Sequence, residues 1–276
     1  MYTGTTFRVK SGRLMGVHQK IDRVARRALA QKLPHKTIFP SERKIIHFEG
    51  LNGPDGIKRK SPGRDEPWHY INPQDPTDVS LRTMISDHAH NLIEALVQDN
   101  HERAAFEAAW IAHSITDGLT PAHHYPLEAE LEEMRDGRGL ETRNSAKEKL
   151  LLPGKTRREQ VRNNWKVWGA KGIMTTHLAF ELGVATTIAG QRIAAATPTD
   201  DEYADILERG IIARFDDALE TIVSLGLYEE FSRSGWTRRL AHDTRHILVP
   251  EICKTVCLIW YYCDIQASNQ RKDRHR

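Results

Sequence analysis

Apolar residues recur at spacings of three and four along most regular segments of this chain, and no other feature limits its fold as strongly. The segment from 14 to 30 places one stripe of apolar residues at these spacings: Leu14, Val17, Ile21, Val24, Ala25 and Ala28. Such a stripe is typical of an amphipathic helix that packs against other helices. The sequence shows neither a good strand pattern nor an internal repeat. It therefore predicts an all-α protein.

The same periodicity predicts five more helices along the chain. They are expected over residues 79–98, 102–116, 173–196, 201–225 and 249–265. The stretch 36–78 contains six prolines and four glycines, so it cannot form a long helix or a central strand. An irregular segment of this length in a compact domain is usually functional or disordered.

The highly charged segment 127–171, which contains Trp165 and Trp168, is expected to be a helical insertion and not a second domain. The sequence therefore predicts one helical domain over residues 1–265 that includes this insertion. The basic residues 266–276 are expected to form a disordered tail.

The composition is that of a folded protein without a membrane-spanning helix. Of the 276 residues, 39% are hydrophobic, which suffices for a core and excludes a collagen-like or wholly disordered chain. The most apolar segment, 247–262, is interrupted by Pro250, Glu251 and Lys254, and falls short of the ~18 apolar residues of a membrane helix. The first residues lack the apolar stretch of a secretory signal, which predicts a cytoplasmic location unless a leader was removed.

Three cysteines clustered in the last apolar segment predict buried thiols and no disulfide framework: Cys253, Cys257 and Cys263.

Charge is distributed unevenly along the chain. Residues 1–60 contain 14 Lys and Arg against 4 acidic residues, whereas residues 61–266 carry a net charge of −10. A basic segment can attract phosphate-bearing substrates or anionic lipid head groups, but charge runs are also common on solvated faces. Peripheral contact with an anionic surface is therefore one of two interpretations of this segment.

Two histidines precede a carboxylate by four residues on predicted apolar helices. These pairs are His113 with Asp117 and His177 with Glu181. Residues four apart share one face of a helix, so both side chains of a pair can bind one metal ion. A single pair of this kind is more often a surface ion pair. Here the flanking residues are apolar, and a buried imidazole requires a polar partner.

Further candidate ligands lie outside these two helices. His123 and His124 come just after the first helical pair, in the sequence PAHHYP, and either could supply a third imidazole. Asp55 and His69 lie in the breaker-rich stretch, whose backbone can wrap around a site. His18 interrupts the apolar stripe of the first helix and faces the core, as a metal ligand or as a hydrogen-bonded core histidine.

Taken in order, these residues resemble the zinc-dependent phospholipase C family and the related fungal single-strand-specific nucleases. The resemblance covers residues 18–181, and it implies a helical bundle around as many as three zinc ions. The family's spacing favours His123 over His124. The implied ligands are Asp55, His69, His113 and Asp117 for one zinc, His123, His177 and Glu181 for a second, and His18 with a bridging Asp117 for a third.

The ligand types suit this chemistry independently of the family. Mixed His and carboxylate ligation suits Zn²⁺, and three such ligands leave a position open for water or a substrate oxygen. Metal ions bound in this way can activate water and hold phosphoryl oxygens. We therefore predict a zinc-dependent phosphodiester hydrolase, similar to phospholipase C. The family resemblance and the irregular segment in which Asp55 lies both point to Asp55 as its general base. Its substrate would be a phospholipid head group, a single-stranded nucleic acid or a small phosphodiester.

Two features depart from the family pattern. Secreted members bind the third zinc through the amine and carbonyl of an N-terminal Trp, whereas no Trp opens this chain and seventeen residues precede His18. We therefore expect two zinc ions and a third site that is at most partly filled. The 54 residues between His123 and His177 are also longer than in the compact phospholipases, which places the insertion near the mouth of the site.

Two other classes of protein are alternatives to a hydrolase of the phospholipase C type. One is a non-catalytic helical protein in which the cluster is a structural metal site. The other is a metal phosphohydrolase of the HD type, which is set aside because the candidate ligands include no adjacent His-Asp pair.

Overall fold

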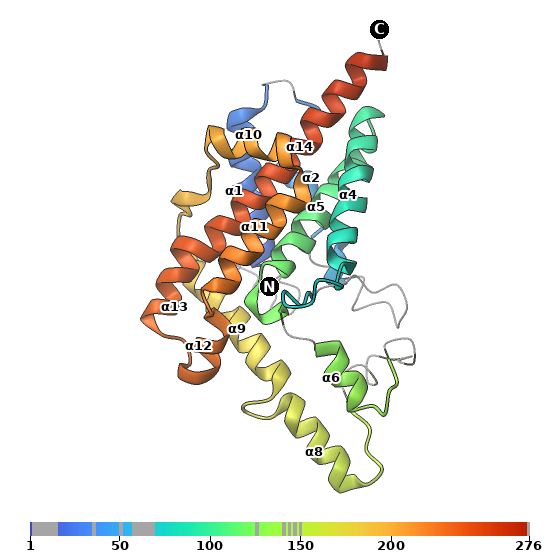
Figure 1. Ribbon diagram of the computed structural model, residues 1–276, viewed down its shortest axis with the longest axis vertical. Helices are drawn as coiled ribbons and strands as arrows, with labels where there is room; N and C mark the ends of the chain where they lie inside the picture. Colours follow the sequence, from blue (N-terminus) through green and yellow to red (C-terminus); the bar gives the residue numbers. More distant parts are fainter. Residues whose placement is uncertain are drawn as a thin grey trace.

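The protein is described from a computed structural model. The model describes residues 1, 16–34, 37–49, 52–56, 70–124, 127–139, 142, 145, 148 and 151–274. Within these ranges the regular structure is helical and no strand occurs, which confirms the all-α prediction (Figure 1).

The long last helix, α14 (Val249–Arg274), is the centre of the bundle and packs against helices from the first half of the chain. These helices are α1 (Val17–Lys32), α4 (Ser80–Val97) and α5 (His101–Gly118). Trp260 of α14 is fully buried, and its indole nitrogen donates a hydrogen bond to the Ala108 carbonyl of α5 at 3.0 Å. The three cysteines lie buried and unpaired along α14, as predicted.

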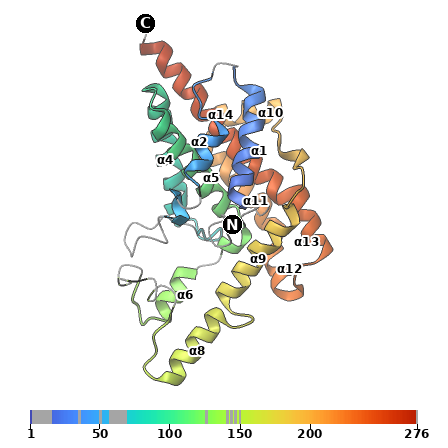
Figure 2. The same ribbon diagram turned by 180° about the vertical axis from the view of Figure 1, so that it is seen from behind.

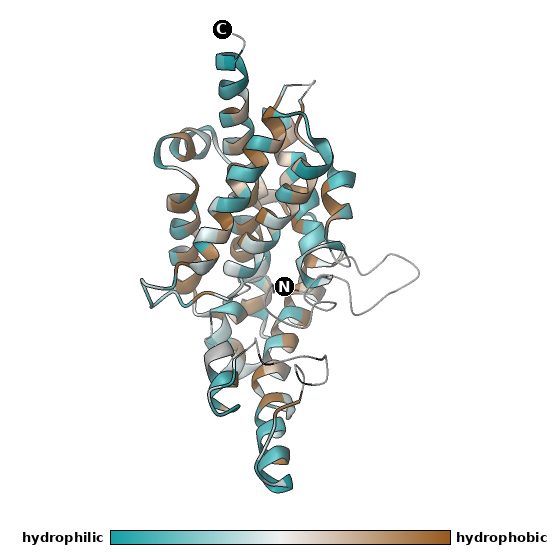
Figure 3. Ribbon diagram, turned by 90° about the vertical axis from the view of Figure 1, so that its right-hand side faces the viewer, coloured by the Kyte–Doolittle hydropathy of each residue, from teal (hydrophilic) through white to brown (hydrophobic). Residues whose placement is uncertain are grey.

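The remaining helices surround this centre. In chain order they are α2 (Glu42–His47), α6 (Leu127–Glu133), α8 (Arg157–Trp168), α9 (Ile173–Ile188), α10 (Asp200–Arg209), α11 (Ile211–Ser224), α12 (Leu227–Ser234) and α13 (Arg238–Asp243). Short 3₁₀ turns at Pro121–His123 (η2) and Ala194–Ala196 (η4) follow α5 and α9, and a π-helical turn, Thr244–Leu248, leads into α14. Figure 3 shows hydrophobic and hydrophilic residues mixed along the helices, as amphipathic packing requires.

Helix boundaries differ from the sequence expectations in three places. The helix expected over 201–225 is two helices, because Gly210 adopts a φ of +85° that favours glycine and ends α10. The helix expected over 173–196 ends at Ile188. The residues expected to form a disordered tail are helical as far as Arg274, where an ion pair of Arg271 with Asp99 ties α14 to the end of α4.

The charged segment expected to be an insertion contributes α6 and α8, which lie at the end of the molecule opposite the C-terminus (Figures 1 and 2). A small apolar cluster holds α8 in place through three buried side chains: Leu131, Leu152 and Val167. None of the described helices combines the length and the apolar character needed to cross a membrane.

The contact between α9 and Trp236 supplies a test of the packing that positions α9. A Cβ added at Gly183 would lie 2.3 Å from the Trp236 ring, whose indole nitrogen donates to Thr187 of the same helix at 3.0 Å. We expect Gly183→Ala to lower the free energy of unfolding by about 1–3 kcal/mol, because the ring must move. Urea denaturation measures the change.

The matched control is the same substitution in a Trp236→Ala background. There the clash is absent, and the higher helix propensity of alanine should make the change neutral or stabilising by up to ~1 kcal/mol. An equal loss of stability in both backgrounds would show that Trp236 does not pack on α9 in this way.

Candidate metal centre

Two sets of three side chains come together in the interior, and each could hold a metal ion. One set is His18, His113 and Asp117; the other is His123, His177 and Glu181. Within each set the potential ligand atoms lie within 4.8 Å of one another, and all six residues are buried. The two sets draw on α1, α5, η2 and α9, so the site depends on the packing of segments far apart in the sequence.

Local helical geometry explains two of the three residues in each set. His113 and Asp117 are one turn apart on α5, with His113 Nε2 3.2 Å from Asp117 Oδ2. His177 and Glu181 are one turn apart on α9, with His177 Nε2 2.9 Å from Glu181 Oε1. Helix packing adds His18, whose ring stacks on that of His113 with centroids 4.2 Å apart.

Asp117 is the residue that joins the two sets. Its Oδ1 lies 3.2 Å from His18 Nε2 and 3.7 Å from His123 Nε2. In the second set Glu181 contacts His123 as well as His177, with Glu181 Oε1 3.1 Å from His123 Nε2. Tyr70 stacks on the His123 ring at a centroid distance of 5.0 Å.

The amino group of Met1 lies between the two carboxylates. It donates a hydrogen bond to Asp117 Oδ1 at 2.6 Å and lies 3.3 Å from Glu181 Oε1, and Figures 1 and 2 show the N-terminus in the middle of the molecule. The structure thus brings an N-terminal amine close to His18 although seventeen residues precede it in the sequence, because the Met1 nitrogen and His18 Nε2 both lie near Asp117 Oδ1. Sequence distance could not predict this contact, which attraction between opposite charges favours.

Burial and charge act against each other at these groups. Burial disfavours the charged Met1 amine, but Asp117 and Glu181 outweigh it and raise the pKa of the amine to about 10. Burial likewise opposes the charge of Asp117 and Glu181, yet the ammonium and the neighbouring histidines hold the pKa of both carboxyls well below the usual range. The pKa of His113 is raised well above its usual value, since Asp117 and Glu49 overcome the effect of burial. The centre is therefore a set of compensated buried charges.

The other predicted ligands are placed differently. Asp55 lies at the edge of the first set, with Oδ1 3.9 Å from His113 Nε2 and a side chain that is 31% exposed. His69 lies outside the described residues. The resemblance divided His18 and His113 between two zinc ions, whereas the structure brings them into one set.

The adjacent histidines of the PAHHYP sequence have separate roles. His123 belongs to the second donor set. His124 instead lies 2.9 Å from the Gly118 carbonyl, and it belongs to neither set. Burial lowers the pKa of His124 to about 4, so it is neutral in the folded protein at neutral pH.

Two buried acids beside the first set were not among the predicted residues. Glu49 Oε2 lies 3.4 Å from His113 Nδ1, on the side of the ring away from Asp117. Asp22 is 1% exposed, and burial together with nearby Glu49 raises its pKa well above the usual range. His18 and Asp22 repeat the four-residue spacing of the recognised pairs, so this signal was present in the sequence; no comparable spacing marks Glu49.

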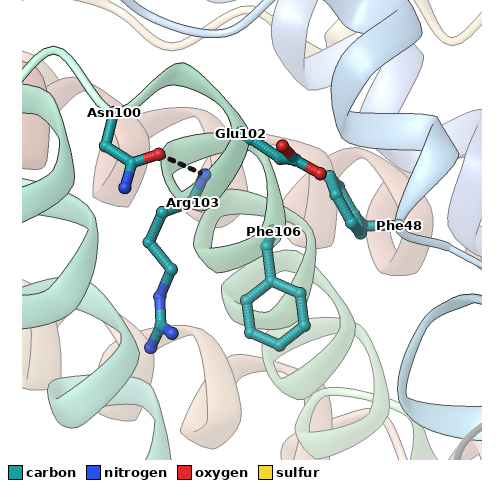
Figure 4. A pocket seen from close by; sticks show the side chains of 5 residues that line it. All are labelled: Phe48, Asn100, Glu102, Arg103 and Phe106. Atoms are coloured by element: carbon teal, nitrogen blue, oxygen red, sulfur yellow. Dashed lines mark hydrogen bonds between the residues drawn. The ribbon is translucent and has the colours of Figure 1, made fainter.

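Two other features lie outside the donor sets. The chain does contain a His-Asp dipeptide, His242–Asp243, but the His242 side chain is 66% exposed and the pair belongs to neither set. A surface hollow of about 350 Å³ lies at the start of α5 and contains none of the six donor residues (Figure 4). Its lining residues are Phe48, Asn100, Glu102, Arg103 and Phe106.

Comparison of the chain with protein family models, with curated proteins and with solved structures gave no match. The site is therefore interpreted from its own geometry. Buried imidazoles and carboxylates that converge from several helices provide the ligand types of a zinc or other transition-metal site.

The contact of Glu49 with His113 should matter for metal affinity. A carboxylate on Nδ1 fixes the orientation of the ring so that Nε2 faces the donor set, and the loss of such a contact typically weakens metal binding by about 10- to 100-fold. We expect Glu49→Ala to raise the Kd for Zn²⁺ by this factor, as measured by competition with a chromophoric chelator. Glu94→Ala, which removes a half-exposed carboxylate next to the exposed His90, is the matched control and should leave the Kd unchanged. Equal affinity of both variants and the parent would refute an orienting role.

The buried neutral His124 predicts a dependence of stability on pH. The unfolded chain binds a proton near pH 6.5 and the folded chain only near pH 4, so stability is complete above pH 6.5 and falls as the pH drops toward 4. The contribution of His124 to the slope should be about 1.4 kcal/mol per pH unit in this window. Urea denaturation from pH 7 to 4, in one chelator-containing buffer, should give a shallower slope for His124→Gln than for the parent. Parallel curves would contradict the assignment.

Proposed function

We propose that the protein is a metal-dependent hydrolase that cleaves phosphodiester bonds, as the zinc-dependent phospholipase C family does. The observation that carries the proposal is the convergence of two buried His and carboxylate sets on one carboxylate, Asp117. A fold stabilised by apolar packing alone has no reason to bury six such side chains together, because uncompensated burial of polar groups costs free energy.

The side chains present fit zinc. His18 is 1% exposed, and within the described part of the chain neither of its ring nitrogens makes a hydrogen bond of normal geometry. Buried imidazoles without such a bond are expected where a metal ion is the partner. The donors are nitrogen and oxygen atoms, three in each set, as in catalytic zinc sites. Zinc bound there would supply an acidified water molecule and a positive charge for phosphoryl oxygens.

The residues of the chain have distinct roles in this proposal. The six buried donors would hold two zinc ions, and Glu49 would orient His113. Asp55, partly exposed at the edge of the first set, would accept a proton from water while it remains accessible to substrate. The Met1 ammonium forms ion pairs with both Asp117 and Glu181, and a third metal ion at Asp117 would compete with this ammonium.

The substrate class within this proposal is a phosphodiester, either a phospholipid head group or a single-stranded nucleic acid. A nuclease-like phosphodiesterase would use the same metal chemistry, so the donor sets do not separate the two substrates. The second candidate function is a helical protein with a structural metal site. The full burial of the donor sets favours it, whereas the exposure of Asp55 favours catalysis.

Hydrolysis of bis-nitrophenyl phosphate by the zinc-loaded protein tests the proposal. We expect metal-dependent turnover that Asp55→Asn lowers by about 10²- to 10⁴-fold, because a general base contributes this factor. Zinc content should not change in this variant. Asp117→Asn should lose both zinc and turnover, whereas the exposed His90→Asn is the matched control and should keep both.

The possible results separate the candidate functions. Full zinc content without turnover on this ester, on phospholipid or on single-stranded nucleic acid would establish a structural metal site and end the catalytic proposal. Turnover that survives Asp55→Asn would remove Asp55 from the mechanism.

A further inference from the structure

The outer face of α8 exposes two large apolar side chains. Val161 is 68% exposed and Trp165 is 70% exposed, the two highest values among large hydrophobic residues in this part of the chain. They are one turn apart and therefore lie on the same side of the helix. The opposite side contains two buried residues: Val167 packs with Leu131 and Leu152 in the small apolar cluster, and Asn163 donates a hydrogen bond to the Pro153 carbonyl. Among the residues that the structure describes, this face is therefore left largely uncovered.

Basic residues surround these apolar side chains. Residues 155–171 contain six Lys and Arg and one acidic residue, in a region, 61–266, whose net charge is −10. All six basic residues are exposed: Lys155, Arg157, Arg158, Arg162, Lys166 and Lys171. Arg157 and Arg158 share the side of the helix that presents Val161 and Trp165, given their spacing. The patch therefore combines apolar area with concentrated positive charge.

We propose that this face of α8, formed by Arg157, Arg158, Val161 and Trp165, docks on the surface of a bilayer that contains anionic lipid. A helix with Trp and an aliphatic side chain on one face and basic residues beside them can bury its apolar side chains at the head-group boundary. The basic residues gain from the negative surface potential of such a bilayer. The proposal concerns a surface outside the metal centre and does not require the proposed activity.

Shape and side-chain chemistry favour a bilayer over a nucleic acid. Figures 1 and 2 show α8 projecting at one end of the molecule. A projecting helix meets a flat surface readily, whereas single-stranded nucleic acids bind in charged grooves with aromatic platforms. Val161 offers no ring for base stacking, but it can be buried among lipid head groups.

The docking face is joined to the metal centre by packed residues. Val167 of α8 belongs to a cluster that also involves Ile173 at the start of α9, and Tyr70 packs on this cluster and stacks on His123. The helix that follows, α9, contains His177 and Glu181. A bilayer bound at α8 would therefore be connected, through the packing of α8 on α9, to two residues of the second donor set.

Vesicle co-sedimentation of the full chain tests the proposal. We expect binding to phosphatidylcholine vesicles that contain about one third phosphatidylserine, weaker binding as salt is raised, and little binding to phosphatidylcholine alone. The double variant Val161→Ser with Trp165→Ser should raise the apparent Kd for anionic vesicles by about tenfold or more. A control that changes two other exposed apolar residues, Leu207→Ser with Val223→Ser, should bind as the parent does.

A second variant keeps the test independent of any effect of the first on folding. Arg157→Gln with Arg158→Gln leaves the apolar face intact and should weaken binding to anionic vesicles by about tenfold, with a smaller dependence on salt. Failure of the parent to bind anionic vesicles would overturn the proposal. So would binding that neither double variant weakens. Binding of a single-stranded oligonucleotide that depends on Trp165, without vesicle binding, would assign the face to nucleic acid instead.

Discussion

The carboxylate of Asp117 is the point on which the structure of the interior depends. It is 2% exposed and contacts four nitrogen-bearing groups: the Met1 amine, His18, His113 and His123. A carboxylate buried this deeply would be costly without cationic or hydrogen-bonding partners. Its partners come from the chain terminus, α1, α5 and η2. The bundle therefore has to bring these four segments together for the charge to be compensated.

The need to compensate the buried charge of Asp117 connects the packing of the helices to the chemistry of the centre. The apolar stripes of α1, α4, α5 and α14 form the surrounding core, and they hold the polar centre away from bulk water. In such surroundings charges interact strongly, which explains why Asp117 and Glu181 remain ionised while His113 is easily protonated. Bound metal ions would replace the protons of the histidines as the positive charges that balance the two carboxylates. The same buried geometry thus provides both an arrangement of ion pairs and two sets of potential metal ligands.

Local patterns in the sequence predicted the all-α class and the two helical His and carboxylate pairs, because four-residue spacing on a helix determines which side chains share a face. What depends on packing could not be predicted in this way. The stacking of His18 on His113, the contact of Met1 with Asp117 and the approach of Glu49 to His113 each join distant segments. The sequence pattern also did not predict the break between α10 and α11 at Gly210, because an isolated glycine within a helical pattern is often tolerated.

Anomalous diffraction at the zinc edge, from crystals of protein that was never exposed to chelator, tests the central claim most directly. We expect one peak in contact with His18, His113 and Asp117 and a second in contact with His123, His177 and Glu181. Fully ordered donor sets with no anomalous peak at either place, the six side chains being satisfied by one another and by Met1, would contradict it.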